Sequence, residues 1–470
     1  MCFNWSTVPL KEVLELVIDH RGKTPKKLGF EDFYESGHPV LSAKHVKTAG
    51  LANTDSFRYA NKTMYEKWMK EPVQQGDIIL TSEAPMGETY YIDGSVKYVL
   101  GQRVFGLRPK KELIEPLYLL AWLSSHKGQA RLRARATGST VQGIKQAELL
   151  KIEIELPPLA VQKIISANVS ALSSKIQLNN QINKTLEQMA QAIFKSWFVD
   201  FEPTKAKIAV LDAGGTEEDA LLAAMTAISG KNNAELEQFK NVSQEQYDKL
   251  KSTAELFPPE MQDSELGEIP DGWEIQSIGE AVTAVGGGTP STKNPEYWDD
   301  GVINWTTPKD LSSLQDKILT DTSRKITEQG LAKISSRLLS VDTVLMSSRA
   351  PVGYLALAKI PVAINQGYIA MKCDKVLTPE YVLQWCSASM EEIKGRAGGT
   401  TFAEISRTSF REIPVIVPSQ GVITSYSDIV KNFYKLITKN ALQSNTLAEI
   451  RDTLLPRLLS GEIDVSAITD

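Results

Sequence analysis

The sequence predicts an α+β fold made of two pseudo-repeated α/β domains that are separated by two long antiparallel coiled-coil helices. Two observations lead to this prediction. The same series of short motifs occurs twice in the 470 residues. Each copy also ends in a long segment whose apolar residues recur at alternating steps of four and three, as in a coiled coil. The length corresponds to about three domains at roughly 150 residues each, which excludes one small domain.

Four motif pairs define the repeat, and they follow one another in the same order in both copies. Each copy has a tryptophan before a Thr-Pro turn, then an Ala-Pro-x-Gly turn behind a strand-like segment, a glutamine motif and a glycine-hydroxyl motif. The pairs are Trp5 with Gly22-Lys23-Thr24-Pro25 and Trp273 with Gly287-Gly288-Thr289-Pro290, Ala84-Pro85-Met86-Gly87 and Ala350-Pro351-Val352-Gly353, Gly101-Gln102-Arg103 and Asn365-Gln366-Gly367, and Gly138-Ser139-Thr140 and Gly399-Thr400-Thr401.

Each copy then passes through a predicted strand into a predicted long helix. Alternating apolar residues predict the strand, and a proline stops it. The strand residues are Ile152, Ile154 and Leu156 in the first copy and Ile413, Val415 and Val417 in the second. A helix over about 160–198 would span about 55–60 Å at 1.5 Å per residue, so the helix pair would be a rigid spacer. Its seam residues are Val161, Ile165, Leu172, Ile182, Leu186, Met189 and Ile193 in one helix and Val422, Tyr426, Ile429, Phe433, Leu436, Leu447, Ile450 and Leu454 in the other.

One equivalent seam position holds an asparagine in both helices, Asn179 and Asn440. A buried amide there would fix the register and orientation of the pair at some cost in stability, although both side chains could instead face solvent. Between the two copies, residues 202–262 have no counterpart and are rich in alanine and acidic residues. We interpret them as a linker that is partly helical, with helix expected from about Thr216 to Ile228.

The composition indicates a globular cytoplasmic protein with no bulk affinity for nucleic acid. Hydrophobic residues make up 42% and charged residues 23% of the chain, and the net charge is −5. Nucleic-acid binding would therefore depend on local basic patches. The three cysteines form no CxxC pair, which predicts reduced thiols, and no run approaches the roughly 20 apolar residues of a membrane helix. We expect no membrane association.

The sequence predicts no catalytic residues, no cofactor and no metal site. Gly22-Lys23-Thr24 lacks the earlier glycine of a P-loop, and the run at Gly286 lacks the flanking pattern of a dinucleotide loop, so both are interpreted as turns. Asn294-Pro295-Glu296-Tyr297 departs from the Asn-Pro-Pro-Tyr loop of amino-methyltransferases at Glu296. The four histidines form no zinc pair and no triad.

Clusters of basic and hydroxyl-bearing residues are the more informative feature. Arginine and lysine neutralise phosphates, and serine, threonine and glutamine can bond phosphates or base edges. A solvated charged face explains any one such run. Two runs in the first copy of an acidic protein, with a weaker one in the second, favour DNA binding. The candidates are Lys23, Lys44, Arg133, Arg135, Ser139, Thr140, Gln142 and Lys145 in the first copy and Lys293, Lys309, Arg349, Arg396, Thr400 and Thr401 in the second.

Several of these segments resemble the specificity subunits of type I restriction–modification systems, and the resemblance covers essentially the whole chain. The most specific matches are Gly138-Ser139-Thr140 leading to Leu156-Pro157-Pro158-Leu159 and Gln162, the segment Ile193-Phe194-Lys195-Ser196-Trp197-Phe198-Val199-Asp200-Phe201, and the segment Leu454-Leu455-Pro456-Arg457-Leu458-Leu459-Ser460-Gly461-Glu462-Ile463. The second copy departs from the pattern with a single proline, Pro418, and Gln420 two positions later.

The resemblance implies a non-catalytic, sequence-specific reader of double-stranded DNA that binds methyltransferase (modification) subunits and directs the restriction and motor subunits. The expected parts are target-recognition domain 1 at 1–157, a central spacer helix at 158–201, the linker at 202–262, target-recognition domain 2 at 263–418, and a C-terminal spacer helix and tail at 419–470. Since the two domains differ in sequence, the target would be asymmetric and bipartite.

Two faces of the helices are candidates for docking the methyltransferase subunits. They carry Phe194, Trp197 and Phe198 in the first helix and Leu454, Leu455 and Leu458 in the second, and packing of the pair against itself explains them equally well. Two other functions stay open on the residues alone. One is a degenerate DNA methyltransferase or nuclease, which would bind S-adenosylmethionine or cut DNA by itself. The other is a coiled-coil scaffold that does not read DNA.

Overall fold

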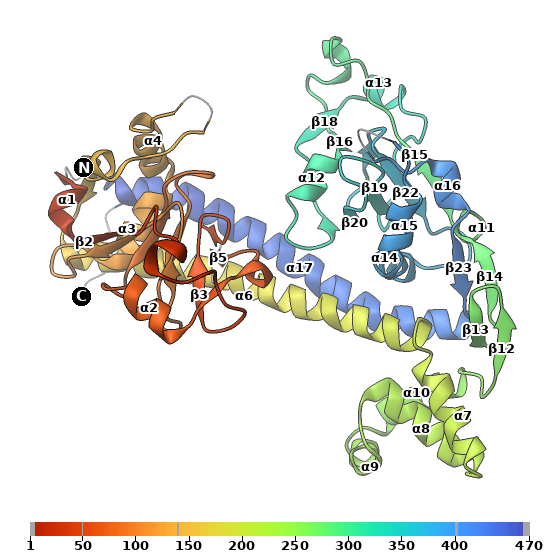
Figure 1. Ribbon diagram of the computed structural model, residues 1–470. Helices are drawn as coiled ribbons and strands as arrows, with labels where there is room; N and C mark the ends of the chain where they lie inside the picture. The colour runs from red at the N-terminus through yellow and green to blue at the C-terminus, as the bar shows by residue number, and fades with distance from the viewer. Residues whose placement is uncertain (1–4, 49, 139–140, 400–402, 464–470) are drawn as a thin grey trace. The chain divides into compact units, whose positions relative to one another are not determined.

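The computed structural model describes residues 5–48, 50–138, 141–399 and 403–463 (Figure 1). Its contacts divide the chain into two compact units. Unit 1 is drawn from residues 1–178 and 443–470, and unit 2 comprises residues 179–442. Two long helices, α6 and α17, pass from one unit into the other, so each unit contains part of both helices.

Unit 1 is built on a four-stranded antiparallel sheet with the strand order β2-β10-β7-β8. A three-stranded sheet, β6-β3-β9, lies beside it, and in this sheet β3 and β9 run parallel. The strands are β1 (Ser6–Pro9), β2 (Leu14–Asp19), β3 (His38–Leu41), β4 (Val46–Lys47), β5 (Gly50–Leu51), β6 (Tyr59–Ala60), β7 (Ile78–Thr81), β8 (Thr89–Tyr91), β9 (Val99–Leu100), β10 (Val104–Pro109) and β11 (Glu153–Leu156). The helices are α1 (Leu10–Val13), α2 (Lys62–Trp68), α3 (Pro116–Ser124), α4 (His126–Ala134) and α5 (Gln146–Leu149).

Unit 2 contains the corresponding sheets, β15-β22-β19-β20-β17 and β18-β16-β21. Its strands are β12 (Met261–Ser264), β13 (Gly267–Pro270), β14 (Glu274–Ser277), β15 (Thr283–Gly286), β16 (Ile303–Thr306), β17 (Ile318–Leu319), β18 (Arg324–Ile326), β19 (Val344–Ser347), β20 (Leu355–Ala358), β21 (Ala363–Ile364), β22 (Tyr368–Lys372) and β23 (Pro414–Val417). Its short helices are α11 (Ile278–Ala281), α12 (Pro308–Ser312), α13 (Glu328–Leu331), α14 (Pro379–Ala388), α15 (Met390–Gly395) and α16 (Arg407–Arg411).

The two units confirm the internal repeat. In both, the first four strands of the main sheet follow the same antiparallel order, and the small sheet has one parallel and one antiparallel pair. Both Ala-Pro turns contain a cis peptide bond, at Ala84-Pro85 and at Ala350-Pro351. The main sheet of unit 2 differs by one extra edge strand, β17, which runs parallel to β20. The sequence therefore predicts the α+β fold class correctly.

The two long helices are equivalent in length and position within the repeat. Helix α6 comprises Leu159–Phe198 and α17 comprises Gln420–Leu459, 40 residues each. Both begin shortly after the proline that ends the preceding strand, at positions separated by the same 261 residues that separate Asn179 from Asn440. The single proline of the second copy thus leaves the start of its helix unchanged.

Within unit 2, α6 and α17 run antiparallel, and asparagines lie at their contact. The Nδ2 of Asn440 donates to the Oδ1 of Asn183 at 2.9 Å, and the Nδ2 of Asn179 donates to the carbonyl of Asn440 at 3.4 Å. Further along, Glu187 of α6 accepts a hydrogen bond from Tyr434 of α17, so residue numbers rise on one helix as they fall on the other. Asn179 and Asn440 are both buried, and equivalent positions of the two helices meet here.

Three predicted seam residues are exposed. Met189 is 45%, Leu436 42% and Ile450 41% exposed. Met189 and Ile450 occupy equivalent positions of the two helices, 261 residues apart. Alternating steps of four and three mark the apolar positions of a helix, but they do not tell which of these positions other side chains cover. Each helix therefore presents an apolar side chain to solvent at the same place in the repeat.

The segment between the two copies, which we interpret from the sequence as a partly helical linker, contains four short helices. They are α7 (Glu202–Asp212), α8 (Glu217–Ser229), α9 (Asn233–Val242) and α10 (Gln244–Glu255). Buried residues from α8, α9 and α10, including Met225, Leu236 and Ala254, form a small separate core. Helix α8 lies where the sequence predicts helix and begins with a capping box between Thr216 and Asp219. Short helices packed on one another give only weak periodicity, which explains the interpretation as a linker.

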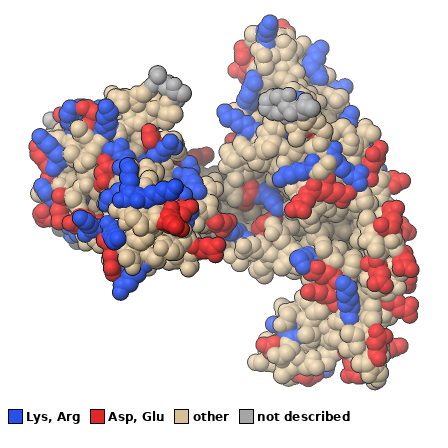
Figure 2. All heavy atoms as spheres, viewed as in Figure 1, with Lys and Arg blue, Asp and Glu red and all other residues tan. Residues whose placement is uncertain are grey.

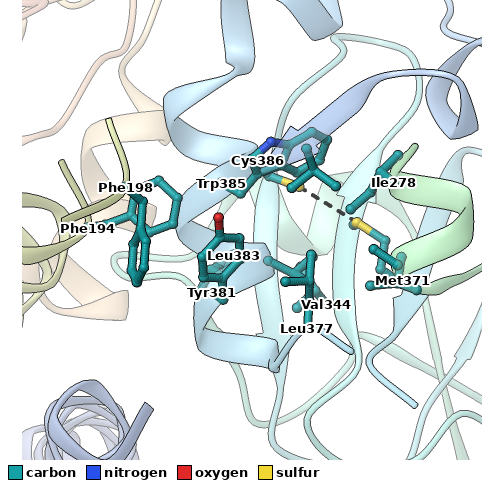
Figure 3. Close-up of a cluster of buried hydrophobic side chains, with 14 of the residues drawn as sticks. Phe194, Phe198, Ile278, Val344, Met371, Leu377, Tyr381, Leu383, Trp385 and Cys386 are labelled. Carbon is teal, nitrogen blue, oxygen red and sulfur yellow. Dashed lines mark hydrogen bonds between the residues drawn. The ribbon is translucent and has the colours of Figure 1, made fainter. Parts of the chain in front are cut away.

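Aromatic residues at the end of α6 are part of the unit 2 core, where Phe194 and Phe198 lie beside Tyr381 (Figure 3). Phe194, Trp197 and Phe198 are each no more than 3% exposed. The Phe198 ring lies 4.9 Å from the ring of Tyr381 and 5.0 Å from the ring of Tyr426, measured between centroids, with steep interplanar angles. Such edge-to-face pairs are favourable beyond their buried area.

The candidate docking residues of both helices are therefore covered by the chain itself. Phe194, Trp197 and Phe198 lie inside unit 2, while Leu455 and Leu458 are buried in the unit 1 core and Leu454 packs against that core. The sequence left docking and packing of the pair open for these residues, because an apolar pattern does not say which surface provides the cover. Their positions favour the alternative in which they pack the chain against itself.

We predict that Phe198→Ala lowers the free energy of unfolding by about 3–5 kcal/mol, because it removes a buried ring that contacts several others. The measurement is urea-induced unfolding followed by circular dichroism. Val199→Ala is the matched control, since Val199 is 47% exposed, and it should change stability by less than about 0.5 kcal/mol. Equal unfolding midpoints for the two variants would contradict the central role of this cluster.

Candidate nucleic-acid interface

Several loops of unit 1 gather at one edge of its main sheet, because antiparallel neighbours place the end of one strand beside the start of the next. Asp19, the last residue of β2, pairs with Phe105 near the start of β10. Thr81, the last residue of β7, pairs with Val104, the first residue of β10. The first residue of β8, Thr89, lies next to the end of β7. The loops that follow β2 and β7 and those that precede β8 and β10 therefore share this edge.

The loop with the glycine-hydroxyl motif is fastened to the same edge by backbone hydrogen bonds. Thr137 and Gly143 exchange two such bonds, of 2.8 and 2.9 Å, which close the loop into a hairpin. The N–H of Ile144 then donates to the carbonyl of Ser82, just beyond β7, at 2.9 Å. Ser82 donates in turn to the residue that precedes β10. Backbone contacts alone thus fix the base of this loop.

Unit 2 repeats this arrangement bond for bond. Gly398 and Glu404 exchange the two hairpin bonds, Ile405 donates to the carbonyl of Ser348, and Ser348 donates to the carbonyl of Gly367. Since backbone groups make all these bonds, the side chains at the edge are free to differ between the copies. They do differ, because Glu83 and Gly143 of unit 1 stand where unit 2 has Arg349 and Glu404. The two units therefore share the backbone geometry of this edge but differ in its side chains.

The Thr-Pro turn joins the same edge through the repeated glutamine. In unit 1 the Nε2 of Gln102 donates to the carbonyl of Lys23 at 2.9 Å, and the N–H of Gly22 donates to the Gln102 Oε1 at 3.3 Å. In unit 2 the hydroxyl of Thr289 donates to the Oε1 of Gln366. Gly22 has a φ of +86°, which glycine adopts without strain. The structure thus confirms a turn at this motif.

Close backbone packing accounts for the glycine run of the second copy. A Cβ atom on Gly287 would lie 2.0 Å from the carbonyl oxygen of Ile364, a distance that no side chain tolerates. The next N–H, of Gly288, donates to that same carbonyl at 2.9 Å. A glycine is therefore required here for close approach to the neighbouring strand, as expected for a turn.

Positive charge at the unit 1 edge is partly neutralised. Figure 2 shows lysine and arginine side chains gathered on the visible face of this unit, with acidic side chains among them. Arg21 pairs with Asp19 at 2.7 Å and stacks on the Phe105 ring, and Arg103 pairs with Glu83 at 3.1 Å. These pairs hold the guanidinium groups in fixed positions beside the hairpin loop.

At the Thr-Pro turn of unit 1, burial and neighbouring positive charge lower the pKa values of His20 and Lys23. Burial, followed by the positive charge of Lys23, lowers the pKa of His20 to about 4 against the opposing effect of Asp19. The imidazole is therefore neutral at pH 7. Burial, followed by the charge of Lys70, also lowers the pKa of Lys23, whose ammonium group donates to the Trp68 carbonyl at 2.8 Å. An approaching anion would favour the charged form of both groups.

The structure places the predicted DNA-binding residues in four different situations. The structure leaves Arg133, Gln142, Lys145, Lys293 and Lys309 exposed, with no ion pair or side-chain hydrogen bond to other described residues. Four others have partners: Lys23 as above, Arg135 with Glu148, Arg349 with Glu404 and Arg396 with Glu392. Lys44 is exposed and makes one long bond to the Ser56 carbonyl. Ser139, Thr140, Thr400 and Thr401 lie outside the described residues.

The structure brings some of these residues to the shared edge and adds others. Arg349 forms a bridge to Glu404 at the base of the second hairpin loop. A hollow of about 240 Å³ beside it is lined by Gln366, Ser348, Tyr368 and Arg407 among others. The sequence contains a signal for Gln366, because the glutamine motif is repeated, but a repeat by itself does not indicate a binding site. Nothing local marks Arg407, which lies beside the site only in the folded chain.

The sequence comparisons identify the family. The family model described as "Type I restriction modification DNA specificity domain" matches residues 3–188 and 270–451. The chain belongs to this family. It is 31% identical over 406 residues to the Type I restriction enzyme HindI specificity subunit of Haemophilus influenzae, covering 84% of the chain and 88% of that protein.

Two further comparisons support this assignment. The Type I restriction enzyme MjaIX specificity subunit of Methanocaldococcus jannaschii is 34% identical over 193 residues, which covers 41% of the chain and 44% of that protein. The crystal structure of a type I restriction–modification S subunit from M. genitalium has the same fold, with a TM-score of 0.52 and 15% identity. That match covers 97% of the chain and 96% of the crystallised chain. The chain is therefore a type I specificity subunit by family, and it shares the fold of the crystallised S subunit.

We predict that Arg133→Gln weakens binding of all DNA sequences about equally and lowers the slope of log affinity against log salt by about one, because an unpaired exposed guanidinium is suited to a phosphate. The measurement is DNA affinity of the complex assembled with its methyltransferase subunits, over a range of salt concentrations. Lys251→Gln in α10 is the control, since Lys251 is also exposed. Loss of affinity for the cognate site only would instead assign Arg133 to a base, and no effect would remove it from the interface.

Proposed function

We propose that this chain is the DNA-reading subunit of a type I restriction–modification complex and that it reads an asymmetric bipartite target. The observation that carries the proposal is the same clamped loop at the same sheet edge in two domains, with different side chains on each. A shared frame with different side chains suits two half-sites of different sequence. The recognition domains of this proposal are residues 1–157 and 263–418.

In this proposal α6 and α17 set the length of the unread gap between the half-sites. A spacer made of paired helices resists bending, and its length is fixed by the number of residues at 1.5 Å each. The asparagine contacts at Asn179, Asn183 and Asn440 support one register of the pair, and a fixed register gives one gap.

The chemistry in this proposal belongs to the partner subunits. The chain would bind methyltransferase subunits and, through the complex, direct restriction and motor subunits to the target, while it catalyses nothing itself. A purified chain that binds S-adenosylmethionine or cuts DNA alone would contradict this. In the part of the chain that the structure describes, no helix is long and apolar enough to cross a membrane.

Exposed apolar residues of the long helices are better candidates for docking the methyltransferase subunits than the buried ones predicted from the sequence. Met189 and Ile450 occupy equivalent positions and are both exposed. Equivalent positions on two helices suit two copies of one partner, since each copy would meet the same surface. Both positions hold an exposed apolar side chain, although one residue is methionine and the other isoleucine.

We expect that co-expression of this chain with the methyltransferase subunit of its own system, in a host free of DNA methylation, modifies adenines at one split asymmetric motif. Genome-wide mapping of modified bases is the measurement, and omission of this chain is the control. The motif should disappear in the control. An assembled, cofactor-bound complex that methylates no motif would make the scaffold the better account.

Deleting one heptad from both α6 and α17 at facing positions should shorten the unread gap by about three base pairs. Seven residues correspond to about 10.5 Å of helix, and one base pair occupies about 3.4 Å of duplex. The half-site sequences should stay the same, which the methylation map reports in the same experiment. A deleted variant that assembles and keeps the original gap would exclude the helices as the spacer.

For the docking surface, we predict that Met189→Glu and Ile450→Glu each remove one methyltransferase copy from the complex, because a carboxylate cannot be buried there without a partner. Native mass spectrometry would give the stoichiometry. Val242→Glu is the control, since Val242 is exposed in α9, outside the two helices. Wild-type stoichiometry in both variants would place the docking surface elsewhere.

A further inference from the structure

The second recognition domain is attached to the long helices by a partly buried polar network that centres on Glu187 of α6. Its Oε1 accepts from the Lys317 ammonium at 2.8 Å and from the Gln384 amide at 3.0 Å. Its Oε2 accepts from the Tyr434 hydroxyl at 2.9 Å. Gln384 also donates to the oxygen of Tyr434 at 2.6 Å. The network joins α6, α17, α14 and the loop before β17.

A second contact lies one helical turn away on α6. The Nδ2 of Asn183 donates to the Oδ2 of Asp316 at 3.0 Å, and Asp316 also accepts from the N–H of Ile318 at 3.2 Å. Asn183 simultaneously donates to the carbonyl of Ile437 in α17. One asparagine therefore touches both the partner helix and the recognition domain.

The domain side of this network belongs to the element that distinguishes unit 2 from unit 1. Asp316 and Lys317 immediately precede β17, the fifth strand of the main sheet. The corresponding sheet of unit 1 has four strands in the residues that the structure describes. The extra edge strand thus brings an acidic and a basic side chain against α6.

Small residues replace the network in the first copy. At the spacing of the repeat, Glu187 corresponds to Ala448, Tyr434 to Ser173 and Gln384 to Ala121. Asn183 corresponds to Ser444. None of the first three replacements supplies the carboxylate, phenol or amide that the network needs. The fold is formed in both copies, so it does not depend on these groups.

Opposing effects determine the pKa values of the two carboxyl groups in the network, Glu187 and Asp316. Burial pushes the pKa of Glu187 upwards, but the Lys317 ammonium and the hydrogen bonds outweigh it, so the pKa lies below its ordinary value. Burial raises the pKa of Asp316, and the charge of Glu187 adds to the rise while the Asn183 amide opposes it. Buried ion pairs contribute little net stability compared with apolar packing, and their best-attested role is to fix one arrangement among several.

We propose that Glu187, Lys317, Gln384, Tyr434 and the pair Asn183–Asp316 are positioning residues that hold the second recognition domain in one orientation on the spacer. They touch no DNA. They restrict the complex to one gap length by preventing the domain from rotating or sliding on α6. This inference rests on the proposed function, because it concerns the same bipartite target.

The test compares the gap lengths that the wild-type complex and a variant accept. The variant combines Glu187→Ala, which is the residue of the first copy, with Lys317→Ala, so that no buried charge is left without its partner. DNA substrates carry the two half-sites with the wild-type gap or with a gap one base pair longer or shorter, and methylation of each is measured. Lys359→Ala is the matched control, because Lys359 pairs with Asp342 inside the same domain.

The variant should keep both half-site sequences and raise methylation at the neighbouring gaps, relative to the preferred gap, by about tenfold, which corresponds to about 1.4 kcal/mol. The control should keep wild-type selectivity. Tyr434→Phe removes one hydroxyl only and should give a smaller change in the same direction, which covers the case in which the double variant does not fold. Folded variants with wild-type gap selectivity overturn the proposal. A wild-type complex without any bipartite motif overturns the proposed function instead.

Discussion

The packing of α6 against α17 is the contact on which each unit depends. In unit 2, Phe194 and Phe198 of α6 meet Tyr426 of α17 at the centre of the core. In unit 1, Ile165 of α6 and Leu458 of α17 lie in a single core with the main sheet. Helices in water gain most of their stability from such tertiary contacts. Each unit is therefore completed by side chains that come from both helices, and neither core is closed by its own α/β segment alone.

The polar residues within this pair restrict it to one arrangement. Apolar seams tolerate shifts in register, because any apolar residue packs acceptably against another, whereas an amide that loses its partner is buried without a hydrogen bond. Asn179 and Asn183 of α6 are each hydrogen-bonded to Asn440 of α17 in unit 2. Asn179 and Asn440, which occupy equivalent positions of the repeat, contact each other here.

In both units, backbone hydrogen bonds fix the loop geometry at one edge of the main sheet, while the side chains at that edge differ between the units. The bonds that close each hairpin loop and tie it to the strand edge recur between Gly143 and Thr137 and between Glu404 and Gly398. This separation allows the residues at the edge to change without loss of the loop's position. The contacts with the long helices differ between the copies as well. Unit 2 has a polar network on Glu187, and the sequence of the first copy lacks the residues that such a network needs. Two domains of one fold thus carry different side chains at this edge and make different contacts with the long helices.

The sequence by itself determined the repeat, the strands and the two long helices, because motif order and residue periodicity are local properties of a chain. It also placed asparagine at the helix contact, although it left open whether Asn179 faces solvent. Only the tertiary structure decided which surface covers Trp197, that Met189 is exposed, and that Arg349 already has an acidic partner in Glu404. An apolar or charged pattern states that a residue needs a partner of a given kind. The identity of that partner depends on residues far away in the sequence, which meet only when the sheets and helices have assembled.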